Sequence, residues 1–133
     1  MNKAIILTTK DDDTDYWVGK SIQWKKISSP LKKLKDIKRV FIYFTAFKET
    51  NGKRSYRGEN ASSIIYCGDF SKVKLNNEDR IRIEITKKCT PINIQLLRDS
   101  GIVAEKSCMR GNIIYLDEQK YNKLSNMFQE RQK

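Results

Sequence analysis

The sequence predicts a mixed α/β fold in which short helices flank a small curved β-sheet. Three observations carry this prediction. Apolar runs of strand length recur along the chain, Ser, Thr or Asp marks a helix start between them, and an amphipathic stretch follows the last run. The chain has 133 residues, the length of one domain with a modest core, so we expect a single domain over 1–133.

Five segments have the pattern of β-strands. The first, Lys3–Thr9, holds a short buried run, and Arg39–Phe47 carries apolar side chains on both faces, which indicates a central strand. The next strand is Ser62–Cys67. In Asp79–Thr86 isoleucines alternate strictly with charged residues, as expected of a strand with one face buried. The last strand is Asn112–Leu116.

Helices are expected at three places between and after these strands. One begins at Ser29-Pro30, because serine caps a helix and proline fits its first turn. A second opens at Thr90-Pro91 and runs to about Arg98, and a third follows a cap at Asp117. The polar segments 11–15 and 48–60 are expected to be loops, the first of them acidic and solvated.

The charge balance indicates a polyanionic partner. There are 27 Lys or Arg residues against 16 Asp or Glu residues, a net charge of +11, and a surplus of this size attracts nucleic acid. Eight of the basic residues lie between Trp17 and Arg39, and Trp24 lies in the same stretch. Because aromatic rings stack on bases and basic side chains contact phosphates, this stretch predicts a nucleic-acid-binding surface. Core packing is the alternative role for both tryptophans.

Catalytic patterns are missing. The sequence has no histidine, which removes the commonest general base and zinc ligand. Gly19-Lys20-Ser21 matches the end of a phosphate-binding loop, but the glycine required five positions earlier is Thr14. The acidic segment 11–15 lacks the alternating ligands and turn glycine of a calcium loop. We therefore expect no enzymatic activity, no metal and no cofactor.

The cysteines and the apolar runs bear on cellular location. Three cysteines without CxxC spacing are typical of free thiols in a reducing compartment, so we expect the cytoplasm. No apolar run approaches the length of a membrane span, and we expect no membrane partner.

Six segments stand in a characteristic order. They are GKSIQW, LKKLKDIKRVFIYFT, SSIIYCGDF, DRIRIEI, TPINIQLL and GNIIYLDEQKYNKL. In this order they resemble the elements of the PUA-like superfamily and, within it, of the EVE and YTH-like domains. The resemblance covers almost the whole chain and implies a PUA-like sheet or barrel flanked by short helices.

The resemblance also implies a function and a site. These families bind nucleic acid and hold one modified base, often a methylated one, in an aromatic cage. Carried over to this chain, the base-binding residues would be Trp24, Trp17, Tyr43, Thr45, Tyr66, Phe70 and Thr8. The phosphate-binding residues, expected from the basic positions of the sequence, are Lys20, Lys25, Lys26, Lys53, Arg54, Arg57 and Arg110.

The prediction is a non-catalytic domain that holds a flipped, methylated base of DNA. Such a domain acts as the N-terminal specificity module of a modification-dependent restriction system, fused to or associated with a motor or nuclease. Two alternatives stay open. One is a PUA-like module that binds tRNA or another structured or modified RNA, and the other is a basic protein-interaction domain.

Overall fold

The computed structural model describes residues 2–24, 36–104 and 113–132, so the helix expected at Ser29-Pro30 lies outside it. The α-helices within these ranges are α1 (Ile94–Asp99) and α2 (Glu118–Glu130). The strands are β1 (Asn2–Thr9), β2 (Ser21–Trp24), β3 (Arg39–Phe44), β4 (Phe47–Thr50), β5 (Lys53–Tyr56), β6 (Ser63–Leu75), β7 (Glu78–Asn93) and β8 (Ile113–Asp117).

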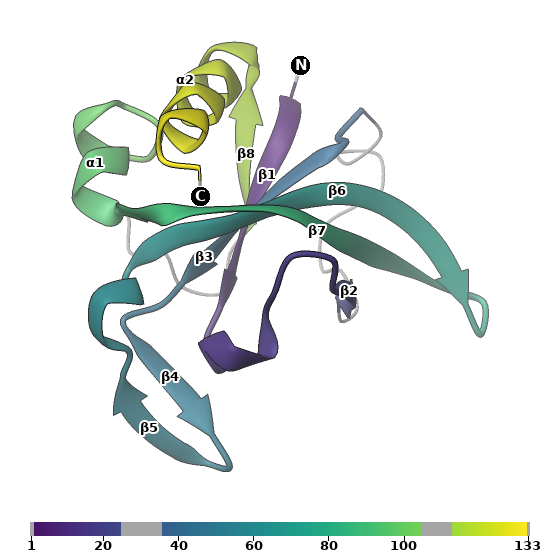
Figure 1. Ribbon diagram of the computed structural model, residues 1–133. Helices are drawn as coiled ribbons and strands as arrows, with labels where there is room; N and C mark the ends of the chain where they lie inside the picture. Colours follow the sequence, from purple (N-terminus) through teal and green to yellow (C-terminus); the bar gives the residue numbers. More distant parts are fainter. Residues whose placement is uncertain (1, 25–35, 105–112, 133) are drawn as a thin grey trace.

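Six of the strands form one curved sheet in the order β2-β7-β6-β3-β1-β8, and β4 and β5 form a separate hairpin (Figure 1). Strands β1 and β3 run parallel, and the other neighbours in the large sheet are antiparallel. Strand β3 is central, as expected, and is buried from Val40 to Phe44. The predicted mixed α/β fold with a small curved sheet and short helices is confirmed.

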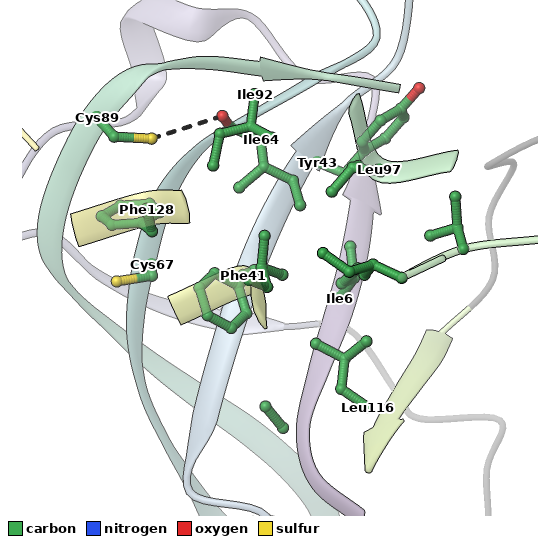
Figure 2. Close-up of a cluster of buried hydrophobic side chains, with 14 residues drawn as sticks. Ile6, Phe41, Tyr43, Ile64, Cys67, Cys89, Ile92, Leu97, Leu116 and Phe128 are labelled. Carbon is green, nitrogen blue, oxygen red and sulfur yellow. Dashed lines mark hydrogen bonds between the residues drawn. The ribbon is translucent and has the colours of Figure 1, made fainter. Parts of the chain in front are cut away.

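The alternation of side chains along the strands builds two hydrophobic clusters, one on each face of the sheet. The helix-side cluster lies under α1 and α2 (Figure 2). In it Cys67 and Cys89 are buried, and the Cys89 thiol donates to the Ile64 carbonyl at 3.8 Å. The loop-side cluster lies on the opposite face, where Tyr16 and Ile37 cover it. Tyr43 belongs to the first cluster and Tyr66 to the second, so these two rings lie on opposite faces.

Strands β6 and β7 are much longer than the sequence indicated. They form a curved ribbon that crosses the molecule (Figure 1), and β7 continues through Pro91 to Asn93. The helix predicted from Thr90 therefore begins later, at Ile94, where the Asn93 side chain accepts a hydrogen bond from the Leu96 amide at 3.0 Å. Pro91 is tolerated because it lies where the β6–β7 register shifts, so the ladder does not require its missing N–H.

The segment 48–60, predicted to be a loop, contains most of a β-hairpin. Strands β4 and β5 join through Asn51 and Gly52, whose φ angles are 53° and 77°. Positive φ at both positions is the geometry of a type I′ turn, for which Asn-Gly is the preferred sequence. A short 3₁₀ turn, Gly58–Asn60, then leads into β6.

The C-terminal helix is confirmed in place and in its cap. The Asp117 carboxylate accepts a hydrogen bond from the Lys120 amide at 2.9 Å, and Leu124 and Phe128 are buried against the sheet. Within the described ranges, neither helix has the length and apolar character needed to cross a bilayer.

Candidate nucleic-acid interface

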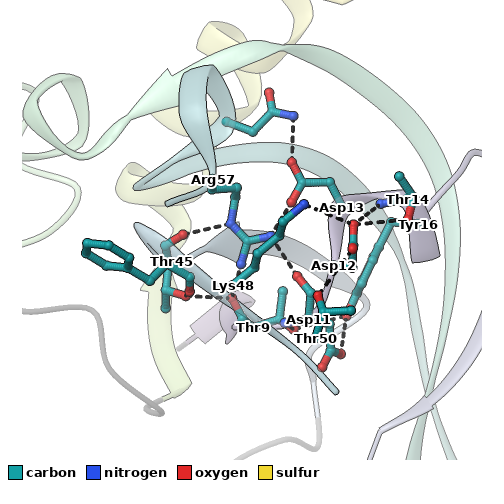
Figure 3. Close-up of polar contacts among 12 residues, drawn as sticks. Thr9, Asp11, Asp12, Asp13, Thr14, Tyr16, Thr45, Lys48, Thr50 and Arg57 are labelled. Carbon is teal, nitrogen blue, oxygen red and sulfur yellow. Dashed lines mark hydrogen bonds and ion pairs between the residues drawn. The ribbon is translucent and has the colours of Figure 1, made fainter. Parts of the chain in front are cut away.

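Arg57 is the centre of a polar network that ties the β4–β5 hairpin to the acidic segment 11–15 (Figure 3). Its side chain is 0% exposed and forms an ion pair with Asp13. The guanidinium also donates to the carbonyl oxygens of Asp11 at 2.6 Å and Thr45 at 2.8 Å, and its central carbon lies 4.9 Å from the Phe44 ring centroid. Because its donors point inward, the Arg57 side chain is not exposed to contact a phosphate. The sequence had suggested such a contact.

The acidic segment is tethered rather than free in solvent. Asp12 accepts hydrogen bonds from the Thr14 amide at 3.1 Å and the Thr50 hydroxyl at 3.3 Å, and it lies 3.5 Å from the Lys48 ammonium. The bonds from Thr14 lower the pKa of the Asp12 carboxyl. Asn60 donates to Asp13 at 2.8 Å. Across the described ranges, no group of three or more Cys, Asp or Glu residues is arranged to hold a metal ion.

Three aromatic rings lie beneath this network. Tyr16 contacts Phe44 edge-to-face at 5.1 Å and Tyr66 at 6.3 Å. The Tyr16 hydroxyl bonds Thr9 at 3.2 Å and Asp11 at 3.0 Å, and the Tyr66 hydroxyl donates to the Tyr16 carbonyl at 3.1 Å. Burial raises the pKa of both phenols, and the Asp13 carboxylate adds to the shift at Tyr66. The rings are thus fixed in one arrangement.

A cleft of about 190 Å³ opens beside Tyr66, and we call it the Tyr66 cleft. Its walls come from β6, β7, Asp13 and the 3₁₀ turn that holds Asn60. The Lys88 ammonium lies 5.7 Å from the centroid of the Tyr66 ring. The cleft therefore combines an aromatic wall with an ammonium donor, an amide and the two carboxylates of Asp13 and Glu59, which suits a flat polar ligand.

Trp17, the residue after Tyr16, is presented to solvent. Its residue surface is 54% exposed, and the Lys20 ammonium lies 4.5 Å from its ring centroid. Two backbone bonds with Ile85, from the Gly19 amide at 2.8 Å and to the Lys20 carbonyl at 2.9 Å, hold the segment against the edge of β7. The structure thus places Trp17 at the surface and not in the core.

The residues predicted to form a base cage do not lie together. Trp17, Tyr66 and Phe70 are on the loop side of the sheet, whereas Tyr43 is in the helix-side cluster and Thr8 follows the alternation of Ile6 on that same face. The Thr45 hydroxyl is engaged with the Phe47 carbonyl at 2.8 Å.

The remaining predicted residues divide into described and undescribed ones. Trp24 pairs with Ile81 through its backbone in β2, but its side chain lies outside the described part, as do Lys25, Lys26 and Arg110. Lys53 and Arg54 are exposed on β5, and Lys20 is half-buried beside Trp17.

Sequence reasoning missed Lys88 and the aromatic pair Phe47 and Tyr56. The sequence assigns Phe47 to the end of the strand Arg39–Phe47 and Tyr56 to a loop, so it does not predict that the two rings meet; in the structure β3 ends at Phe44 and Phe47 begins β4. The signal for the pair was the Asn51-Gly52 dipeptide between two short segments that each hold an aromatic residue. Lys88 had no comparable signal, because only the pairing of Tyr66 with Lys88 across β6 and β7 brings it to the cleft.

Comparison with known proteins identifies the fold but no close relative. No protein-family model matches the chain, and no curated protein matches it in sequence. The crystal structure of ASCH from Zymomonas mobilis shares 13% identity with a TM-score of 0.52, covering 94% of this chain and 95% of that one. A point variant of the same protein gives 11% identity and a TM-score of 0.51, covering 94% of this chain and 98% of that one. ASCH domains belong to the PUA-like superfamily, so the chain has the PUA-like fold that its sequence predicted.

Proposed function

We propose that this chain is a nucleic-acid-binding domain without catalytic activity. The observation that carries the proposal is the exposed Trp17 under the Lys20 ammonium. The Tyr66 cleft, which has its own ammonium from Lys88, is linked to this segment because the Tyr66 hydroxyl donates to the carbonyl of Tyr16, the residue before Trp17. A nucleic-acid site needs aromatic rings on which bases stack and cationic side chains that contact phosphates. The net charge of +11 supports the same reading.

The finer proposal is that the site holds one flipped, methylated base of DNA between Trp17, Trp24 and Tyr66. Flipping costs a few kcal/mol of stacking and pairing, and an aromatic stack returns about 1–3 kcal/mol per base. Tyr43 and Thr8 are not part of this proposal, because they lie on the other face of the sheet. As a specificity module, the domain would direct a fused or associated motor or nuclease to modified DNA.

Structured RNA, such as tRNA or a modified RNA, is the second candidate ligand. The solvent exposure of Trp17, Phe47 and Tyr56 favours it. Proteins recognise RNA mainly through unpaired bases that stack on aromatic side chains, and exposed rings are suited to this contact.

Gel-shift titration tests these proposals on duplexes with and without methylated cytosine or adenine, alongside matched RNA. Trp17→Ala should weaken binding to the preferred oligonucleotide by about 1–3 kcal/mol. The neighbouring exposed Val18, changed to Ala, is the matched control and should bind as the wild type. If the wild type bound none of the oligonucleotides, the nucleic-acid proposal would fail. Oligonucleotides recovered in fragments would refute the non-catalytic part.

Trp24→Ala separates its two roles in the same assay. If Trp24 walls the base site, melting temperature stays unchanged and affinity for the modified oligonucleotide falls by about 1–3 kcal/mol. If it is a core residue, the same change costs about 3–5 kcal/mol of stability. A large drop in melting temperature therefore removes Trp24 from the proposed site.

A further inference from the structure

The β4–β5 hairpin carries an aromatic surface that the proposed base site does not use. Phe47 and Tyr56 are 40% and 65% exposed, and they face each other across the hairpin as a cross-strand pair. Their ring centroids are 5.7 Å apart in an edge-to-face arrangement. The guanidinium carbon of Arg54 lies 4.5 Å from the Phe47 ring centroid. We call these three residues the hairpin platform.

The opposite face of the hairpin is fastened to the body of the protein. Because side chains alternate along a strand, Lys48 and Thr50 point away from the platform, and both contact Asp12 (Figure 3). The Glu49 amide also donates to the Lys10 carbonyl at 2.8 Å. Figure 1 shows the hairpin extending from the large sheet. It is therefore anchored on one face, while Phe47 and Tyr56 on the other are open to solvent.

We infer that the hairpin platform stacks the bases of an unpaired nucleotide segment. This inference rests on the proposed nucleic-acid function and gives it a second contact and a ligand class. The rings of Phe47 and Tyr56 would take the base faces, and the Arg54 guanidinium on the same face would take a flanking phosphate. Base faces are free for stacking only where the nucleotides are unpaired or splayed out.

The chemistry of the hairpin platform favours an unpaired nucleotide segment over a duplex or an acidic protein. Groove readout of a duplex depends on hydrogen bonds to base edges, whereas this surface offers two rings and one guanidinium. An acidic protein partner would match the charge, but it lacks the repeated flat faces that two neighbouring rings accept. The acid on this side of the hairpin, Glu49, lies 3.3 Å from the Lys10 ammonium, which offsets its repulsion of phosphate.

Fluorescence anisotropy on the whole chain tests the inference with a single-stranded DNA, a single-stranded RNA and a duplex of the same sequence. The double variant Phe47→Leu, Tyr56→Leu keeps apolar bulk but removes both ring faces. It should lose at least about tenfold in affinity for a single strand and keep its duplex affinity and its melting temperature. Tyr56→Phe retains the ring and should bind as the wild type. Loss on either single strand supports the inference, and the larger loss identifies the preferred sugar.

Other outcomes would overturn the inference. If the double variant bound both single strands as tightly as the wild type, while Trp17→Ala still weakened binding, the hairpin inference would fail and the proposed function would stand. An equal loss on the duplex would show that the contact does not depend on unpaired bases. Absence of any binding by the wild type would instead remove the proposed function and the inference together.

Discussion

At the scale of single residues, identical side chains have opposite roles. Arg54 and Arg57 lie three positions apart in a polar segment and look alike in the sequence. Arg54 is exposed over the Phe47 ring, whereas Arg57 is buried and its donors are directed at Asp13 and backbone carbonyls. The difference arises from the fold, because the end of the hairpin brings Arg57 against the acidic segment.

Replacing Arg57 with Ala should therefore destabilise the protein. The change leaves Asp13 and the carbonyls of Asp11 and Thr45 without their donor, and breaking a buried ion pair costs about 3–5 kcal/mol. We expect the lower end of that range, because Asp13 is partly exposed. Chemical denaturation measures the loss. Arg54→Ala is the matched control and should stay within about 0.5 kcal/mol of the wild type, and an equal loss in both variants would contradict the anchoring role of Arg57.

Tyr16→Phe should change how stability depends on pH. Burial raises the pKa of the Tyr16 phenol above its ordinary value of 10, so the fold favours the neutral form. This contribution to the free energy of unfolding is fully present below pH 10. It is lost as the pH rises above 10, because Tyr16 then ionises in the unfolded chain but not in the fold. The variant keeps the ring contacts, loses about 1 kcal/mol with its hydrogen bonds, and should decline less steeply in alkali. Melting curves against pH test this, and parallel alkaline profiles would refute it.

At the scale of elements, the β6–β7 ribbon depends on a close backbone approach at Gly68. A Cβ built on this residue would lie 2.1 Å from the Glu84 carbonyl oxygen and 3.1 Å from the Ile85 Cα. Both contacts are to the backbone of β7, which cannot rotate away as a side chain can. Gly68 also lies where the β6–β7 register shifts, so the glycine allows the ribbon to curve there.

Gly68→Ala should accordingly force β7 away from β6. We expect a loss of about 3 kcal/mol, the upper end for inserting one methyl group into a packed site. Ser71→Ala, at an exposed position of the same strand, should change stability by less than about 0.5 kcal/mol. The free energies of unfolding of the two variants give the comparison, and an unchanged value for Gly68→Ala would show that the approach is not required.

Secondary-structure elements that are specified by neighbouring residues in the sequence could be predicted. Strands β1, β3 and β8 and helix α2 were predicted from apolar runs and from the cap at Asp117. The ends of β6 and β7 were missed, because long-range pairing extends them beyond their apolar cores and through Pro91. The site shows the same division. Tyr66 was identified as a candidate, but the sequence could not show that Tyr43 lies on the other face, since a bulge in β6 decides which residues share a side.

At the scale of the whole molecule, the distribution of charge favours a polyanion. Several acids are already paired: Asp12 and Asp13 lie against Lys48 and Arg57, and Asp69 lies 3.2 Å from Arg39. The basic residues outnumber the acids by 27 to 16. Among the exposed ones, Arg54 and Lys88 lie over the rings of Phe47 and Tyr66. A polyanion that also carries aromatic bases satisfies both features at once.

The salt dependence of nucleic-acid affinity tests this account most directly. Binding of the wild type to one labelled oligonucleotide would be titrated at salt concentrations from roughly 50 to 200 mM, a range over which released counterions dominate the change in affinity. The account predicts a fall of at least about tenfold, and Arg54→Gln, which removes a proposed phosphate contact, should reduce the slope of log affinity against log salt by about one. Equal affinity across the range would contradict the claim that binding depends on phosphate contacts, and no binding at the lowest salt would contradict the claim that this protein binds nucleic acid.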